Sequence, residues 1–150
     1  MNIQYELKHF NQLTTNELYE VLKLRTDVFV VEQNCPYPEC DNKDQEAYHL
    51  LAYTENRELM AYVRILAPGV SYKDPAIGRV VVKPEFRLHK KGHELMQEAI
   101  EHTTKLFGTT SITISAQQHL EKFYGNLGFV SKGEMYLEDN IPHVKMVFGS

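Results

Sequence analysis

The stretch Val80-Val81-Val82-Lys83-Pro84-Glu85-Phe86-Arg87-Leu88-His89-Lys90-Lys91-Gly92-His93 decides the fold. Its three valines favour a strand, and Pro84 ends that strand because proline has no amide hydrogen to give to a sheet. Three basic residues then gather where a helix over residues 90–107 begins. A helix N-terminus carries about half a positive charge, so cations there are unfavourable unless an anion binds. Because Gly92 has no side chain, a phosphate group can approach the backbone closely, so the stretch predicts a phosphate-binding site. The alternative is a polar helix start that only contacts solvent.

Outward from this stretch, short strands alternate irregularly with helices. A strand is expected over residues 2–8, then a helix capped by Thr14 or Thr15 that runs into residues 25–33, with an irregular loop after it. Further strands are expected at 48–54, 59–66, 76–82, 111–116, 129–137 and 143–148, and a short helix at 119–127. Strict β-α-β alternation is missing, which predicts an α+β fold with a mostly antiparallel sheet. The length of 150 residues predicts one domain over residues 1–150.

Composition excludes several classes of protein. Hydrophobic residues make up 43% and charged residues 24%, which is typical of a globular chain. The net charge of −4 disfavours a general nucleic-acid binder. No apolar run approaches the roughly 18 residues that span a bilayer, and residues 1–8 do not resemble a signal peptide. We therefore expect a cytoplasmic protein without a membrane or nucleic-acid partner.

Two cysteines, Cys35 and Cys40, lie in a proline-rich loop. They are too few for a disulfide framework in a chain of this size. A zinc site would need more ligands, and His49 is the only nearby candidate. The sequence therefore predicts free thiols and no metal.

Four motifs resemble one enzyme superfamily. Arg87-Leu88-His89-Lys90-Lys91-Gly92 is similar to the acyl-CoA-binding motif of the GNAT acetyltransferases, with Lys90 where the first glycine is usual. The segment from Gln117 to Phe129 resembles that superfamily's later helix, which ends in Tyr-x-x-x-Gly-Phe. The stretches 24–33 and 141–146 resemble the ElaA-like branch. The chain is thus identified as an ElaA-like GNAT N-acetyltransferase.

The resemblance implies a splayed, mostly antiparallel sheet with helices on both faces. The pantetheine arm of acetyl-CoA, the cosubstrate, would lie beside the strand at 80–82, where it would satisfy unpaired backbone groups. The amides after that strand would hold the pyrophosphate, and no metal is implied. The residues expected to contact acetyl-CoA are Val80, Val81, Val82, Arg87, Leu88, His89, Lys90, Lys91, Gly92, His93 and Gln117.

The resemblance also implies direct attack of an amine on the thioester. Tyr124 stands where the family often has the proton donor for the leaving thiolate; its alternative is a core tyrosine. A base must deprotonate the amine, and Glu32 and His143 are the candidates. The candidates for the acceptor pocket are Arg25, His49 and Arg64, although Arg25 is also placed to cap its own helix and a hairpin residue has an even chance of facing solvent.

Two other function classes stay open. One is a non-catalytic acyl-CoA-binding regulatory module. The other follows from the Arg-x-x-Val-Phe stretch starting at Arg25, which is also similar to the front of acyl-homoserine-lactone synthases. The acceptor amine and the choice between monomer and homodimer stay open as well.

Overall fold

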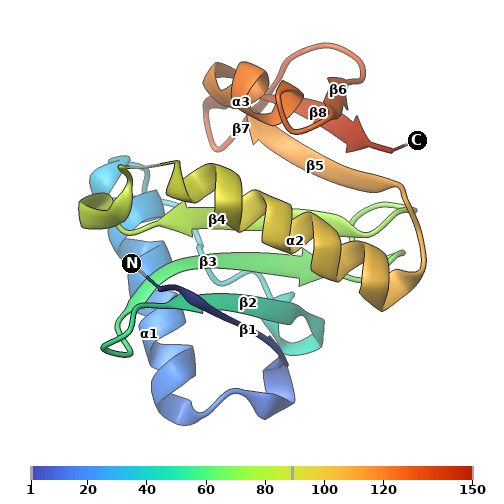
Figure 1. The fold of residues 1–150 in the computed structure, drawn as a ribbon. Coiled ribbons are helices and arrows are strands. Elements are labelled where there is room, and N and C mark those ends of the chain that lie inside the picture. The colour runs from blue at the N-terminus through green and yellow to red at the C-terminus, as the bar shows by residue number, and fades with distance from the viewer. Residues whose placement is uncertain (1, 89, 150) are drawn as a thin grey trace.

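The structure, a computed structural model, describes residues 2–88 and 90–149, and in it the described chain folds around one open sheet (Figure 1). Its strand order is β1-β2-β3-β4-β5-β8-β6, and β7 pairs with β8. The strands are β1 (Gln4–His9), β2 (Tyr48–Tyr53), β3 (Leu59–Leu66), β4 (Ala76–Val82), β5 (Ile112–Gln117), β6 (Phe129–Ser131), β7 (Tyr136–Glu138) and β8 (Ile141–Phe148). Every described pairing except β4–β5 is antiparallel. The predicted mostly antiparallel α+β fold is confirmed.

Helices cover both faces of the sheet, as expected. In Figure 1, α2 (Lys91–Phe107) crosses the front and α1 (Thr15–Arg25) lies behind. Leu95, Met96 and Ala99 of α2 are completely buried against one face, and Val21 of α1 is buried against the other. Burying apolar side chains on both faces removes their surface from water, which is the main force holding these layers together. β3, buried along its whole length, is therefore at the centre of the fold.

Thr14 begins α1 through a capping box. Its hydroxyl accepts a hydrogen bond from the Glu17 amide at 3.1 Å, and the Glu17 carboxylate accepts one from the Thr14 amide at 2.9 Å. These bonds satisfy amides that a helix start otherwise leaves unpaired. After Arg25 the chain continues as a π-helix over Thr26–Glu32, in which the Gln33 amide donates to the Val28 carbonyl. Val28 of this π-helix packs with Val81 of β4 (Ala76–Val82) in one buried cluster.

β4 and β5 are parallel and diverge. Their register contains the single pair Ala76–Thr113 among the described residues. Beyond that pair the two strands separate, so backbone groups toward Val82 and Gln117 face a gap in the ladder. The expected splayed sheet is confirmed.

Two predicted elements are divided in the structure. The strand expected over residues 129–137 is two short strands, β6 and β7, because Gly133 turns the chain with φ 87° between them. The helix expected over residues 119–127 is a 3-10 turn, Gln118–Leu120, followed by α3 (Glu121–Gly125), and the chain leaves it at Gly128 with φ 104°. The positive φ of Gly133 accounts for the first difference; in the second, α3 ends at Gly125, three residues before the expected stop at Gly128.

Candidate active site

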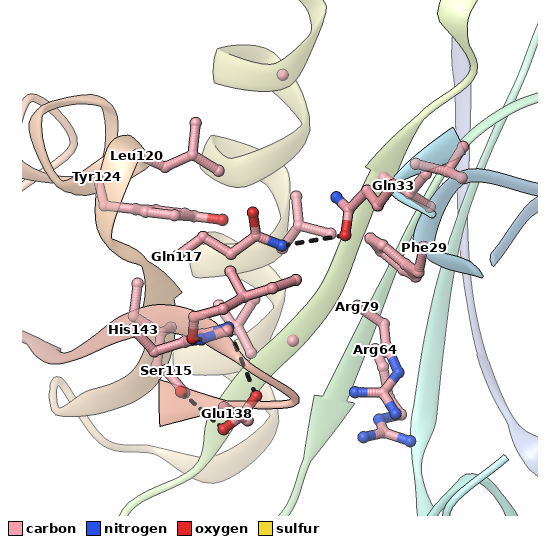
Figure 2. Close-up of a pocket in the computed structure, with 18 of the residues that line it drawn as sticks. Phe29, Gln33, Arg64, Arg79, Ser115, Gln117, Leu120, Tyr124, Glu138 and His143 are labelled. Carbon is pink, nitrogen blue, oxygen red and sulfur yellow. Dashed lines mark hydrogen bonds and ion pairs between the residues drawn. The ribbon is translucent and has the colours of Figure 1, made fainter. Parts of the chain in front are cut away.

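A cleft of about 1260 Å³ opens where β4 and β5 separate. One wall consists of the end of the π-helix and β4, and the other consists of β5, α3 and the β7–β8 hairpin (Figure 2). The loop before α2 forms one end. In the described part of the chain, no helix is long and apolar enough to cross a membrane.

Most residues expected to contact acetyl-CoA line this cleft. They are Val80, Val81, Val82, Arg87, Lys90, Gly92, His93 and Gln117. Leu88 and Lys91 do not line it: Leu88 is 71% exposed, and the Lys91 ammonium lies 3.5 Å from Glu94. The Leu88 side chain therefore faces solvent, whereas the Lys91 side chain is only 14% exposed. Contact of these two residues with acetyl-CoA, expected through the amides of the turn, stays a prediction. His89 lies outside the described residues.

The start of α2 has the geometry of an anion cradle. Gly92 and Phe123 both line the cleft, and a Cβ atom added at Gly92 would lie 3.6 Å from the Phe123 ring, an ordinary contact. Lys90 has φ 59°, a left-handed conformation that glycine adopts without strain and other residues rarely do. This explains why the family motif usually has glycine at the position of Lys90. The residues present fit a pyrophosphate group, because exposed helix amides and a cation face the same end of the cleft.

Arg87 and Glu32 form a two-bond ion pair at the cleft edge. Arg87 Nη1 and Nη2 donate to the two carboxylate oxygens of Glu32 at 2.6 and 2.7 Å, and Arg87 Nε donates to the Val82 carbonyl at 3.0 Å. Hydrogen bonding to Arg87 lowers the pKa of Glu32, which makes this carboxylate a weaker base. Next to it, Gln33 Oε1 accepts a hydrogen bond from Gln117 Nε2 at 3.4 Å. Glu32 and Gln33 thus join the π-helix to both sides of the cleft.

Tyr124 points its hydroxyl into the cleft from α3 (Figure 2). Its ring packs edge-on against Phe123 and Phe129, with centroids 5.1 and 5.9 Å away, and only 7% of the residue is exposed. Burial raises the pKa of Tyr124 to about 12. The phenol therefore stays protonated at neutral pH and is available as a proton donor.

His143 lies on β8 opposite Gln117 and faces the same cleft. Its Nδ1 is 2.7 Å from the Ile141 carbonyl oxygen, so the proton of the neutral ring lies on Nδ1 and the lone pair on Nε2. Nε2 lies 3.6 Å from a carboxylate oxygen of Glu138. The ring also stacks on Tyr136, with an angle of 23° between the planes. His143 is therefore held in the tautomer that accepts a proton at Nε2.

Arg25 and His49 are not brought to the cleft, which corrects two acceptor-pocket predictions. Arg25 is completely buried, and its guanidinium donates to Glu39 at 2.6 Å and to Asp44 at 2.8 Å. His49 is also completely buried; it donates from Nε2 to the Asp44 carbonyl at 3.0 Å and accepts at Nδ1 from Tyr62 at 2.6 Å. Buried polar groups need such partners, so both side chains stabilise the interior.

Arg64 lines the cleft and belongs to a larger ion-pair network. It donates to both oxygens of Asp41 at 2.7 and 2.8 Å and to Asp44 at 3.1 Å. Burial opposes ionisation of Asp41, but Arg64 outweighs it and holds the pKa of Asp41 well below its usual range. The network also contains Arg79, which donates to Glu39 at 2.7 Å. Three arginines, at 25, 64 and 79, thus balance three carboxylates, at 39, 41 and 44.

Several cleft residues were missed by sequence reasoning. Arg79 is one, in β4 with φ 53° where the β3–β4 register shifts. Ser115 and Glu138 are two more, on the opposite wall: Ser115 Oγ donates to Glu138 at 3.2 Å, and it also bonds to the Tyr136 hydroxyl behind them. Ser115 and Gln117 lie two residues apart in β5 and share a face; the expected strand ended at residue 116, so the sequence analysis did not connect them.

Both cysteines are free. Cys35 is half-buried at the cleft edge, with its sulfur 3.6 Å from the Asp139 carbonyl oxygen, and Cys40 is exposed. Among residues 2–88 and 90–149, no group of three or more histidine, cysteine or carboxylate side chains is arranged to hold a metal ion.

Comparison with known proteins identifies relatives over almost the whole chain. A family model described as an acetyltransferase (GNAT) domain matches residues 12–149. Protein ElaA of Escherichia coli is 40% identical over 146 residues, covering 96% of this chain and 95% of that protein. Its crystal structure superposes with a TM-score of 0.90 at 38% identity, covering 98% of this chain and 99% of that one.

Other solved structures extend the comparison. An acyl-CoA N-acyltransferase from Pseudomonas aeruginosa is 44% identical with a TM-score of 0.90, covering 97% of this chain and 99% of that one. The AHL synthase LasI has a TM-score of 0.79, covering 97% of this chain and 89% of that one, at 14% identity. The last likeness shows a shared fold alone.

Proposed function

The chain belongs to the GNAT acetyltransferase family, and we propose that it transfers the acetyl group of acetyl-CoA to an amine. One observation carries the proposal: a single cleft between β4 and β5 has the turn before α2 at one end and the Tyr124 hydroxyl and His143 ring on its wall. We propose further that residues 1–150 act as one domain in the cytoplasm, as a monomer or homodimer.

The loop before α2 would hold the pyrophosphate of acetyl-CoA. The amides from Lys90 onward and the charge of Arg87 supply the attraction, and Gly92 leaves the space. The unpaired edges of β4 and β5 would accept the amides of the pantetheine arm, as they would accept an added strand. This arrangement would direct the thioester toward Tyr124.

His143 and Tyr124 would share the proton transfers. An acceptor amine has an ordinary pKa of roughly 10.4 and arrives as an ammonium at neutral pH. His143 Nε2 would take one proton, and the freed nitrogen lone pair would form the C–N bond at the thioester carbonyl carbon. As the C–S bond breaks, Tyr124 would protonate the sulfur. The new amide nitrogen loses its second proton, which restores Tyr124, and His143 releases the first proton to solvent.

Glu32 is the weaker candidate for the base. Its carboxylate is engaged by Arg87 through both oxygens, whereas Nε2 of His143 is a lone-pair acceptor inside the cleft. His143 also lies beside Glu138, which would stabilise the imidazolium formed during transfer.

Two alternatives are tested by the same experiment. Release of CoA thiol from acetyl-CoA should be measured across a panel of amines, peptides and polyamines, together with acetyl-CoA binding by calorimetry. Binding without transfer to any amine would favour the regulatory module. Transfer from an acyl carrier protein, but not from acetyl-CoA, would favour the acyl-homoserine-lactone-synthase alternative. Amine-dependent release from acetyl-CoA supports the proposal.

A further inference from the structure

Glu138 is a carboxylate in the cleft to which neither the family motifs nor the sequence analysis gave a role. It ends β7, and its side chain is 49% exposed. One oxygen accepts a hydrogen bond from Ser115 Oγ at 3.2 Å, and the other lies 3.6 Å from His143 Nε2 (Figure 2). The carboxylate therefore stands beside the lone pair that would receive the acceptor's proton.

Among the described residues, Glu138 makes no ion pair with a lysine or an arginine, and its one charged contact is with His143. Lys43 donates to the Ser71 hydroxyl at 2.9 Å, and the Lys145 ammonium lies over the Tyr72 ring, 5.5 Å from its centroid. Asp139, the next residue, adds a second carboxylate at the cleft edge. The remaining neighbours, Tyr72 and Tyr136, are phenols; burial raises the pKa of Tyr72, which therefore carries no charge at neutral pH.

The cleft arginines, in contrast, are already neutralised. Arg64 has a side chain 5% exposed and is held by Asp41 and Asp44. Arg79 is held by Glu39 and Asp41. A substrate carboxylate would have to displace one of these carboxylates, with loss of a buried ion pair, before an arginine became available.

We propose that Glu138 binds the ammonium group of the acceptor beside His143, and that the acceptor is an alkyl primary amine with no carboxylate on the carbon next to nitrogen. The inference rests on the proposed acetyl transfer and deepens it. Glu138 attracts the charged amine, and Ser115 positions the Glu138 carboxylate. Leu66 and Tyr72 line the same cleft and offer apolar surface to an alkyl chain.

The Glu138 carboxylate and the His143 imidazole have different roles because their chemistry differs. A carboxylate accepts hydrogen bonds and binds an ammonium without removing its proton, because its own proton affinity is much lower. His143 Nε2 then takes that proton, and the resulting imidazolium remains next to Glu138. The ion pair of ammonium and Glu138 is thus exchanged for one of imidazolium and Glu138, with no net charge moved out of the cleft.

Butylamine and norvaline, which differ by the α-carboxylate, test this proposal. The wild-type protein, Glu138→Gln and the control Glu134→Gln are compared at saturating acetyl-CoA for CoA release, and butylamine binding is measured by calorimetry. Glu134 is exposed in the loop before β7 and does not line the cleft. We expect wild type and Glu134→Gln to acetylate butylamine better than norvaline. Glu138→Gln should raise the KM for butylamine and weaken its binding roughly 10- to 100-fold, with a smaller change in kcat.

The outcomes separate this inference from the proposed function. Turnover of butylamine that Glu138→Gln leaves unchanged, at an unchanged melting temperature, overturns the role of Glu138. A preference for norvaline overturns the acceptor class but leaves acetyl transfer standing. Absence of transfer to every amine on a broad panel, despite acetyl-CoA binding, overturns the proposed function and this inference with it. Ser115→Ala, which keeps Glu138 but removes its donor, should raise the KM for butylamine by less than Glu138→Gln does.

Discussion

Arg87 reaches Glu32 across 55 positions of sequence and donates to both of its carboxylate oxygens, at 2.6 and 2.7 Å. The pair joins the loop before α2 to the end of the π-helix. It also joins a predicted phosphate ligand to a predicted base. While the two side chains are paired, Arg87 cannot give all its hydrogen bonds to a phosphate and Glu32 cannot act as a free base. The ion pair therefore links cosubstrate binding to the position of the π-helix.

Glu32→Gln should leave catalysis intact and strengthen acetyl-CoA binding. Both side chains of the pair are about two-fifths exposed, and solvent screens such pairs, so the gain from freeing Arg87 is at most about fivefold in affinity. Calorimetry measures the affinity, and steady-state kinetics should give a kcat within about twofold of wild type. Arg87→Gln is the matched variant and should weaken binding. A fall in kcat of a hundredfold in Glu32→Gln would instead make Glu32 the base.

Tyr124→Phe should slow transfer without weakening cosubstrate binding. The phenylalanine keeps the edge-on packing against Phe123 and Phe129 and removes only the proton donor. We expect kcat to fall roughly ten- to a thousandfold, the range for loss of one donor to developing charge. Acetyl-CoA affinity, measured by calorimetry, should stay within about twofold of wild type. Full activity per folded molecule with a lower melting temperature would identify Tyr124 as a core residue.

Gly92→Leu should block the pyrophosphate. A Cβ there makes an ordinary contact with Phe123, so Gly92→Ala should fold normally, whereas the larger leucine occupies the cleft side of the turn. Overfilling a fitted space costs about 1–3 kcal/mol, which corresponds to a loss of affinity of roughly 5- to 150-fold. Gly125→Ala is the control, because a Cβ there meets no atom within 4 Å. Unchanged acetyl-CoA affinity in a folded Gly92→Leu protein would place the site elsewhere.

Asp44→Asn should destabilise the fold severely. Asp44 accepts hydrogen bonds from Arg25 and Arg64, whose guanidinium groups are buried, and its neutralisation leaves three arginines facing only two carboxylates, Glu39 and Asp41. Breaking a buried pair in this way costs about 3–5 kcal/mol of the free energy of unfolding. Asp27→Asn removes an exposed pair with Lys23 at a similar distance of 2.7 Å and should change the melting temperature little. Equal effects of the two changes in urea unfolding would contradict a structural role for the network.

Acid should weaken the same network. In the folded protein the pKa values of Asp41 and Asp44 are both lowered: burial opposes ionisation of each carboxyl, but the neighbouring arginines outweigh it. A lowered folded-state pKa gives stability that is fully present above the unfolded value of about 4 and is lost as pH falls below it. The free energy of unfolding should therefore decrease between about pH 5 and pH 2. In Asp41→Asn the free energy of unfolding should decrease less steeply over this pH range. An equal dependence on pH in the variant and the wild type would contradict a contribution of the Asp41 carboxylate.

The sequence by itself determined the elements and the family. Valines before Pro84, the capping residue Thr14 and the apolar spacing of residues 90–107 are local signals, and local signals set strands, caps and amphipathic helices. The ordered motifs around Gly92 and Tyr124 were enough to identify the superfamily and the strand–turn–helix that faces the cleft. Gly133 was visible in the sequence, but its division of the expected strand into β6 and β7 depended on the backbone angle that packing imposed.

Only the tertiary structure decided which charged side chains meet. Arg25, Arg64 and His49 were equally plausible pocket residues in the sequence, yet Arg25 and His49 are completely buried and Arg64 alone reaches the cleft. The carboxylate partners of Arg25 and Arg64 come from the loop at 39–44, whereas His49 bonds to the Asp44 backbone carbonyl and the Tyr62 hydroxyl. Likewise, Glu138 meets Ser115 only because β7 and β5 both pair with β8. Burying an unpaired charge costs free energy, so buried arginines must meet carboxylates. Which side chains are buried together depends on the whole fold, and a local sequence pattern does not contain that information.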